Sequence, residues 1–141
     1  MYVCWRQFTF TPPPPQTQLH SDYIRPDQEY QAFLDQGEIR IQRSRSSGKH
    51  VFYPRVMEPG TGATDLEWVP ITGQGTIYSV TVIHPKPPAA PYNVVLVDLD
   101  EGARMMSRVD GAEVESLAIG QRVKATIATI DGKQAVVFER A

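Results

Sequence analysis

The chain has 141 residues, of which 41% are hydrophobic and 21% charged, and its formal net charge is −2. These totals are ordinary for a soluble protein with one modest core, or with a small barrel and an appendage. The slightly acidic balance argues against a protein whose affinity rests on neutralising many phosphates. One cysteine, Cys4, allows no internal disulfide, which is typical of a reducing compartment. The N-terminus has no leader pattern and no apolar run is long enough to cross a bilayer, so we expect a cytoplasmic protein without membrane contact.

Residues 1–25 are predicted to be an N-terminal arm. Residues 1–11 are rich in aromatic side chains and alternate loosely between apolar and polar. This pattern is typical of a short strand or of a segment laid on a neighbouring surface. Pro12 to Pro15 then favour an extended polyproline II segment, because proline ends hydrogen-bonded structure. Such a run is either a ligand for an aromatic groove or a stiff spacer, and we favour the spacer.

Residues 26–37 are predicted to form a short helix. Pro26 and Asp27 suit its first turn, and Gly37 suits its end. Three apolar side chains fall on one face: Tyr30, Phe33 and Leu34. A helix this short is not stable alone, so we expect this face to dock on the barrel that follows or on a partner subunit.

Residues 38–65 have the spacing of a two-knuckle zinc ribbon. The alternation over residues 38–42 predicts a first strand, and residues 51–53 predict a second strand between the knuckles. Each knuckle is marked by two positions with C-x-x-C spacing. The four predicted ligand positions are Ser44, Ser47, Met57 and Gly60.

These four residue types do not suit zinc. A structural zinc ion needs four ligands in a tetrahedron, usually thiolates or imidazoles. A serine hydroxyl does not deprotonate readily, a thioether is a poor zinc ligand and glycine has no side chain. We therefore expect no zinc in this ribbon and no covalently bound cofactor in the chain.

Residues 66–141 carry a dense β signal. Leu66–Val69 and Thr76–Ile83 are predicted to form one long strand that joins two sheets. Gly73 and Gly75 interrupt this strand, and paired glycines in a strand mark a bulge or a sharp bend.

The rest of this segment completes the predicted barrel. A stiff loop of residues 84–91 follows the first strand, and residues 112–118 suit a short helical link. Asp100-Glu101-Gly102 and Asp131-Gly132 predict two hairpin turns. The other predicted strands are residues 93–99, 103–109, 123–130 and 134–140. Five strands with a helix between the third and the fourth describe an OB-fold, so the predicted fold class is mainly β.

Three stretches of this barrel carry a family resemblance: Trp68–Ser79, Pro91–Gly102 and Ile119–Val123. Preceded by a short helix and a ribbon, they resemble an acyl-CoA-associated family in which a zinc ribbon is joined to an OB-fold. That family was long catalogued as a domain of unknown function. The resemblance covers roughly residues 26–140, and the stretches are specific as a combination.

The resemblance implies a non-catalytic accessory subunit rather than an enzyme. Members of the family sit beside thiolase-like enzymes and their relatives, including aldolases of steroid side-chain breakdown. They help to hold the CoA part of the substrate or keep the complex assembled. Members normally carry C-x-x-C twice, and this chain departs from that pattern at all four positions. Because structural zinc contributes much of the folding energy of small domains, packing or a partner surface must replace it. The residues expected to supply that packing are Val51, Phe52, Tyr53 and Trp68.

Candidate residues for CoA follow from its chemistry, since its phosphates need cations and its adenine and pantetheine need an apolar slot. The predicted CoA-binding residues are Arg43, Arg45, Lys49, Arg55, Lys86, Tyr53 and Tyr78. Each of them has a simpler reading as a solvated charge or a barrel-edge aromatic. No cluster of nucleophile, base and orienting group is recognisable. Acids at a strand end, such as Asp98, Asp100 and Glu101, are read as turn residues.

Two alternatives to the CoA-binding subunit remain open. One is a pure assembly subunit without ligand contact. The other is a single-stranded nucleic-acid-binding OB-fold, which needs a basic groove with stacking aromatics. The barrel strands offer few such aromatics, chiefly Tyr78 and Phe138. We therefore expect a thiolase-like or aldolase-like enzyme subunit and acyl-CoA as partners, and no nucleic acid.

Overall fold

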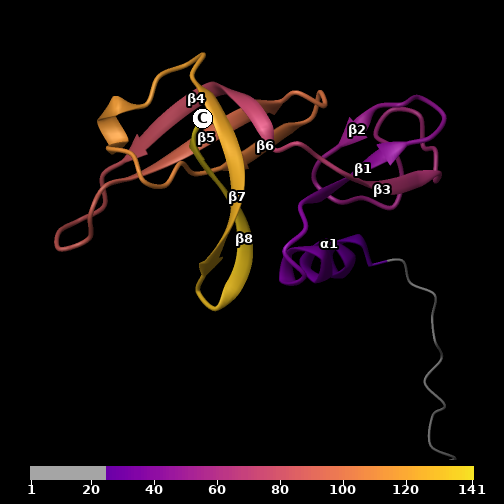
Figure 1. The fold of residues 1–141 in the computed structure, drawn as a ribbon, viewed down its shortest axis with the longest axis horizontal. Coiled ribbons are helices and arrows are strands. Elements are labelled where there is room, and N and C mark those ends of the chain that lie inside the picture. Colours follow the sequence, from indigo (N-terminus) through magenta and orange to yellow (C-terminus); the bar gives the residue numbers. More distant parts are fainter. Residues whose placement is uncertain (1–24) are drawn as a thin grey trace, which may run out of the picture.

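The computed structural model describes residues 25–141, so the predicted strand and proline spacer of the N-terminal arm lie outside the described residues. The described part contains one α-helix and two antiparallel sheets. The smaller sheet has three strands and forms the ribbon, and the larger sheet has five strands and forms the barrel (Figure 1). Within this part, no helix is long and apolar enough to cross a membrane.

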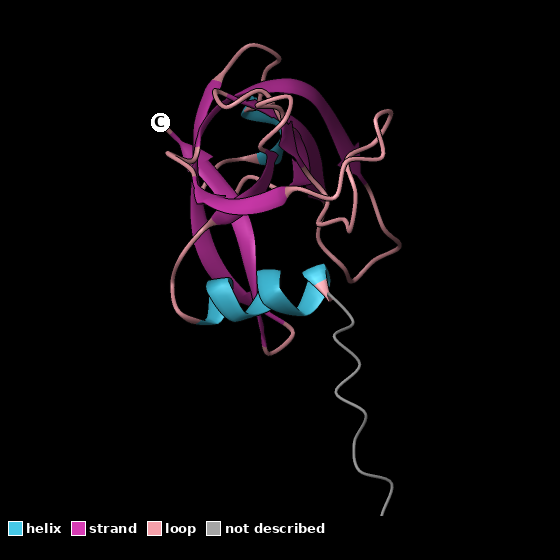
Figure 2. Ribbon diagram, turned by 90° about the vertical axis from the view of Figure 1, so that its right-hand side faces the viewer, coloured by secondary structure: helices cyan, strands magenta, loops and turns pink. Residues whose placement is uncertain are grey.

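Helix α1 (Pro26–Asp35) confirms the predicted helix. Proline stands in its first turn, where a missing N–H costs nothing, and Asp27 and Glu29 complement the positive end of the helix dipole. Gly37 has φ +82°, a left-handed conformation that glycine adopts readily and that ends helices. Figure 2 shows most clearly that helix α1 lies across one end of the barrel strands.

The aromatic face of α1 docks on the ribbon. Tyr30 and Trp68 are stacked with ring centroids 6.4 Å apart, and Phe33 lies 5.3 Å from Trp68. The indole Nε1 of Trp68 donates to the Glu29 carboxylate at 2.6 Å. On the barrel side, the Gln31 amide donates to the Gln134 carbonyl at 3.0 Å. The helix therefore joins the ribbon to the barrel, although its aromatic face lies on the ribbon and not on the barrel as predicted.

The ribbon sheet consists of β1 (Arg40–Ser44), β2 (His50–Val51) and β3 (Leu66–Pro70), with β1 in the middle. Two predictions were wrong here. The second strand was predicted over residues 51–53, but it ends at Val51. The chain turns there, and Phe52 packs edge-on against Tyr30 with ring centroids 5.8 Å apart.

The second error concerns β3, which was predicted to be the first half of a barrel strand. It pairs with β1 instead, with Ile41 opposite Val69. Gly73 has φ +76°, which breaks the extended chain between the two sheets. The boundary between ribbon and barrel sheets therefore lies after Pro70, whereas the predicted segments divided the chain before Leu66.

The larger sheet has the strand order β6-β5-β4-β7-β8 and the topology of the predicted OB-fold. Its strands are β4 (Gln74–Ile83), β5 (Tyr92–Leu99), β6 (Arg104–Ser107), β7 (Arg122–Ile130) and β8 (Lys133–Arg140). A parallel bridge between Val109 and Phe138 brings the two ends of the sheet together. The short 3-10 helix η1 (Val114–Ser116) occupies the predicted place between the third and fourth barrel strands.

Buried residues alternate along β5 and in the first part of β7, whereas β8 buries three residues in a row. The least exposed apolar residues of the barrel are Ile77, Val95, Val97, Met105, Val123, Val137 and Phe138. Gly75 is required by close packing, since a Cβ there would lie 2.5 Å from Cγ1 of Val97. The register of β4 shifts between Ile77 and Ser79, so the expected bulge lies at Tyr78, just past the glycines.

Candidate functional site

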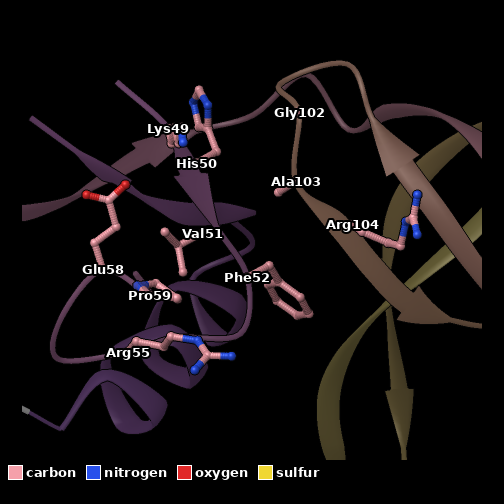
Figure 3. Close-up of a pocket in the computed structure, with 10 residues that line it drawn as sticks. All are labelled: Lys49, His50, Val51, Phe52, Arg55, Glu58, Pro59, Gly102, Ala103 and Arg104. Atoms are coloured by element: carbon pink, nitrogen blue, oxygen red, sulfur yellow. The ribbon is translucent and has the colours of Figure 1, made fainter. Parts of the chain in front are cut away.

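A cleft of about 280 Å³ lies between the ribbon and the barrel (Figure 3). The ribbon side is formed by the first knuckle, β2 and the chain that follows it, and the barrel side by the turn between β5 and β6. The lining residues are Lys49, His50, Val51, Phe52, Arg55, Glu58, Pro59, Gly102, Ala103 and Arg104. Two sheets that are separate in sequence thus share one concave surface.

Four of the lining side chains are basic, and Figure 3 shows them around the cleft. Lys49, His50 and Arg55 belong to the ribbon, and Arg104 belongs to the barrel. Within residues 25–141, neither Lys49 nor Arg55 forms an ion pair. Such a surface suits a ligand with several anionic oxygens, because each cation then keeps donors free for it.

Arg104 is held in place by two neighbours. Its guanidinium pairs with Asp98 at 2.6 Å and lies over the ring of Tyr78, 3.5 Å from the centroid. The hydrogen bond that Arg104 donates to Asp98 raises the pKa of Arg104, so its charge is constant. The planar, stacked guanidinium is therefore presented in one orientation.

Arg55 is positioned through its backbone. The buried side chain of Gln42 accepts from the Arg55 N–H at 2.5 Å and donates to the Arg55 carbonyl at 2.7 Å. These two bonds fix residue 55 against β1 and leave its side chain to extend into the cleft (Figure 3). The position of the guanidinium thus depends on a buried amide rather than on an ion pair.

Glu58 is the one carboxylate of the lining, and both of its oxygens are engaged. It accepts from the Ser47 hydroxyl at 2.6 Å and from the Thr61 hydroxyl at 2.8 Å, and the residue is 3% exposed. The hydrogen bond from Ser47 and then that from Thr61 hold the pKa of Glu58 below its usual range, although burial opposes them. Figure 3 shows the carboxylate directed away from Arg104. Glu58 therefore belongs to the interior of the ribbon more than to the cleft.

The four predicted ligand positions of the ribbon lie in different surroundings. Ser44 is fully buried, and the hydroxyl of the exposed Ser47 donates to Glu58 at 2.6 Å. Met57 is 52% exposed, and nothing lies within 4 Å of a Cβ built on Gly60. Glu58 and Thr61, one residue further along the chain, are hydrogen-bonded to each other instead.

The donors that meet inside the ribbon do not fit zinc. They are hydroxyls and one carboxylate, and zinc in structural sites is held by thiolates and imidazoles. Both oxygens of the Glu58 carboxylate already accept hydrogen bonds from Ser47 and Thr61. These side-chain oxygens are thus unsuited to zinc because of their chemistry rather than their spacing.

The sequence matches the family profile described as ChsH2, C-terminal OB-fold domain, over residues 68–128. A solved structure titled "Ltp2-ChsH2(DUF35) aldolase" is similar to the whole arrangement. It has a TM-score of 0.72 and 28% identity, and the likeness covers 82% of this chain and 94% of that one. A DUF35 domain-containing scaffold protein of Methanocaldococcus jannaschii is 31% identical over 80 residues, or 52% of this chain and 57% of the relative. The chain is therefore similar to DUF35 proteins.

A longer relative comes from Mycobacterium tuberculosis and is named 3-oxo-4,17-pregnadiene-20-carboxyl-CoA hydratase alpha subunit. It is 38% identical over 93 residues, which are 63% of this chain and 29% of the relative. The chain therefore spans less than two thirds of the length of these curated relatives.

The cleft gathers only some of the predicted CoA-binding residues. Lys49 and Arg55 line it, together with His50 and Arg104, which the sequence analysis did not select. Arg104 lies two residues after the D-E-G turn and has no local signal, because the ribbon residues that share the cleft with it come from a separate sheet. The missed residues are thus those whose place depends on how the two sheets meet.

The other predicted residues lie outside the lining of the cleft. Arg43 and Arg45 both pair with Glu67, at 2.6 and 3.1 Å, and their hydrogen bonds lower the pKa of that carboxyl. Lys86 is exposed in the loop between β4 and β5. Tyr53 is 54% exposed and stacks on Phe52, whereas Tyr78 is 51% exposed and lies under Arg104.

The acids at the end of β5 bond to neighbouring strands and loops, which agrees with their interpretation as structural residues of the turn. Asp98 pairs with Arg104, and Asp100 accepts from Arg122 at 2.7 Å. The hydrogen bond from Arg122 holds the pKa of Asp100 below its usual range. Glu101 accepts from the Thr72 N–H at 2.8 Å and so ties the turn to the linker between the sheets.

Proposed function

We propose that this chain is a non-catalytic accessory subunit of a thiolase-like or aldolase-like complex that acts on acyl-CoA, and that its cleft binds the phosphates of CoA. The observation that carries the proposal is the meeting of four basic side chains from two sheets in one cleft. The names of the relatives support it, since they include a hydratase subunit for a carboxyl-CoA compound and an aldolase complex.

The chemistry of the cleft suits the nucleotide end of CoA. Its diphosphate and 3′-phosphate require cationic donors, and an arginine fork binds phosphate through two parallel hydrogen bonds. Arg55 lies on the ribbon side of the cleft and Arg104 on its barrel side, and Lys49 lies next to His50 on the ribbon side (Figure 3). Apolar atoms of Val51, Phe52 and Ala103 lie between these cations and offer contact to a base.

The cleft is too small to hold all of CoA, so the ligand would be shared between this chain and its partner. Pockets that enclose a drug-sized molecule measure about 300–1,000 Å³, and CoA is larger than such molecules. A cleft of about 280 Å³ therefore holds only part of CoA. The pantetheine arm and the acyl group then belong to the partner, which carries the chemistry.

Affinity capture of the tagged full chain from its own cells tests the subunit proposal. We expect a thiolase-like or aldolase-like enzyme to be retained in a fixed ratio, as identified by mass spectrometry. The captured complex should bind CoA saturably in a calorimetric titration. A chain that melts cooperatively as a monomer and retains no enzyme contradicts the proposal.

A pure assembly role is the second candidate, and exposed apolar side chains on the barrel favour it. Tyr92 and Met106 point outward from neighbouring strands and are 48% and 53% exposed. Side chains of this kind are enriched at protein interfaces. Capture of an enzyme partner without CoA binding supports this role in place of the first.

The barrel aromatics do not favour binding of single-stranded nucleic acid. Phe138 is 0% exposed, so it offers no face for a base to stack on. Tyr78 is exposed, but the Arg104 guanidinium lies over its ring. An oligonucleotide that binds with strong salt dependence supports this class instead.

A further inference from the structure

The first knuckle of the ribbon has a defined pattern of backbone hydrogen bonds. The Ser44 N–H donates to the Lys49 carbonyl at 2.9 Å, and the Gly48 N–H donates to the Ser44 carbonyl at 2.8 Å. Gly48 has φ +71°. The Ser47 hydroxyl oxygen accepts from the Lys49 N–H at 3.2 Å.

The loop from Glu58 to Ala63 repeats every one of these contacts. The Glu58 N–H donates to the Ala63 carbonyl at 2.8 Å, and the Gly62 N–H donates to the Glu58 carbonyl at 3.0 Å. Gly62 also has φ +71°. The Thr61 hydroxyl oxygen accepts from the Ala63 N–H at 3.3 Å. Glu58 therefore matches Ser44 in the first knuckle, and Thr61 matches Ser47.

Side chains from the two knuckles meet across the ribbon. The Glu58 carboxylate accepts from Ser47 of the opposite knuckle at 2.6 Å and from Thr61 of its own at 2.8 Å. Ser44 is fully buried beside them, and its hydroxyl oxygen accepts from the Ser47 N–H at 3.4 Å. A zinc ribbon has the same plan, in which two knuckles each contribute two ligands to one metal.

We propose that four side chains occupy the ligand positions of a zinc ribbon in this chain: Ser44, Ser47, Glu58 and Thr61. The Glu58 carboxylate joins the knuckles in place of the metal, so that the ribbon folds without zinc. Asp65 extends the network, since it accepts from the Ser44 hydroxyl at 3.2 Å and from the Ser46 N–H at 2.8 Å. Metal release therefore has no part in the stability of this ribbon.

The network also supports the cleft. The N–H of Lys49 is bonded to Ser47 and its carbonyl to Ser44, so the knuckle fixes this residue on both sides. Lys49 and His50, which follows it, form one wall of the cleft. Lys49 is thus held in that wall by hydrogen bonds that do not depend on a supply of zinc.

Zinc content of two cysteine variants tests the assignment. The variant S44C/S47C/E58C/T61C places thiols at the four matched positions, and we expect about one zinc per chain by elemental analysis after gel filtration. The control S44C/S47C/M57C/G60C has the same number of thiols in the other spacing, and we expect no stoichiometric zinc in it. Zinc in the control alone, or in neither variant when circular dichroism shows both folded, overturns the assignment.

A second measurement keeps the test decisive if a cysteine variant does not fold. We expect a chelator to leave the Tm of the natural full chain unchanged. Glu58→Ala should lower this Tm by roughly 5–10 °C, because it leaves the hydroxyls of Ser47 and Thr61 without their shared acceptor. Glu115→Ala removes an exposed carboxylate and should leave the Tm nearly unchanged. A Tm that falls with chelator, or that Glu58→Ala leaves unaltered, overturns the proposal.

Discussion

Arg55→Glu is expected to weaken CoA binding by about 10- to 100-fold without unfolding the chain. The substitution turns one of the basic side chains of the cleft into an acid that repels phosphate. The fold is retained because residue 55 is held through its backbone by Gln42, which any side chain allows. Titration calorimetry with CoA, on the full chain and on the captured complex, measures the effect.

Arg45→Glu is the matched control for this prediction. It changes the net charge of the chain by the same amount, but Arg45 pairs with Glu67 away from the cleft. We expect at most a 3-fold loss of CoA affinity, because exposed charges at a distance are screened by salt. Equal losses in the two variants indicate a general charge effect, and no loss at Arg55 removes the cleft from CoA binding. A comparison with 3′-dephospho-CoA then shows which phosphate the arginine meets.

Phe138→Ala is expected to lower the free energy of unfolding by about 3–5 kcal/mol. Phe138 is 0% exposed and lies where the barrel closes, opposite Val109. Its backbone N–H donates to the Arg108 carbonyl at 2.9 Å, and its carbonyl accepts from the Asp110 N–H at 2.8 Å. Truncation keeps these bonds but leaves a cavity between β8 and the other barrel strands. Because domains of this kind are stable by only about 5–15 kcal/mol, the variant should lose roughly a fifth or more of its stability.

Urea unfolding of the full chain, followed by circular dichroism, measures this loss. The control is Ile119→Ala, since Ile119 is 73% exposed and its truncation should change stability by less than about 0.5 kcal/mol. A change of less than about 1 kcal/mol for Phe138→Ala indicates that the barrel does not close on this side chain.

Several elements of this protein follow from local signals. The hairpin at Asp131-Gly132 is an example, because both residues have positive φ, of 51° and 78°, and this is what Asp-Gly favours between two strands. Gly37 and the apolar face of α1 are determined in the same way. The alternation in β7 places Val123 and Ala125 inside the barrel.

The errors share a different physical origin. β3 has the composition of a barrel strand, and only its pairing with β1 assigns it to the ribbon. Met57 and Glu58 are neighbours in a loop without periodicity, so spacing alone did not decide which of them points inward. The hydrogen bond between the Glu58 N–H and the Ala63 carbonyl decides it, and this contact exists only once the loop has closed.

The sequence by itself determined the mainly β class, the OB-fold barrel, the helix before the ribbon and the unsuitability of the ribbon for zinc. These features depend on hydrophobic periodicity, turn residues and ligand chemistry, each of which acts over a few neighbouring positions. Only the tertiary structure decided the cleft and the carboxylate network. Arg55 and Arg104 line one cleft because two separate sheets are held together, and Glu58 reaches Ser47 because two loops fold face to face. Such contacts join distant parts of the chain, so no local pattern of residues encodes them.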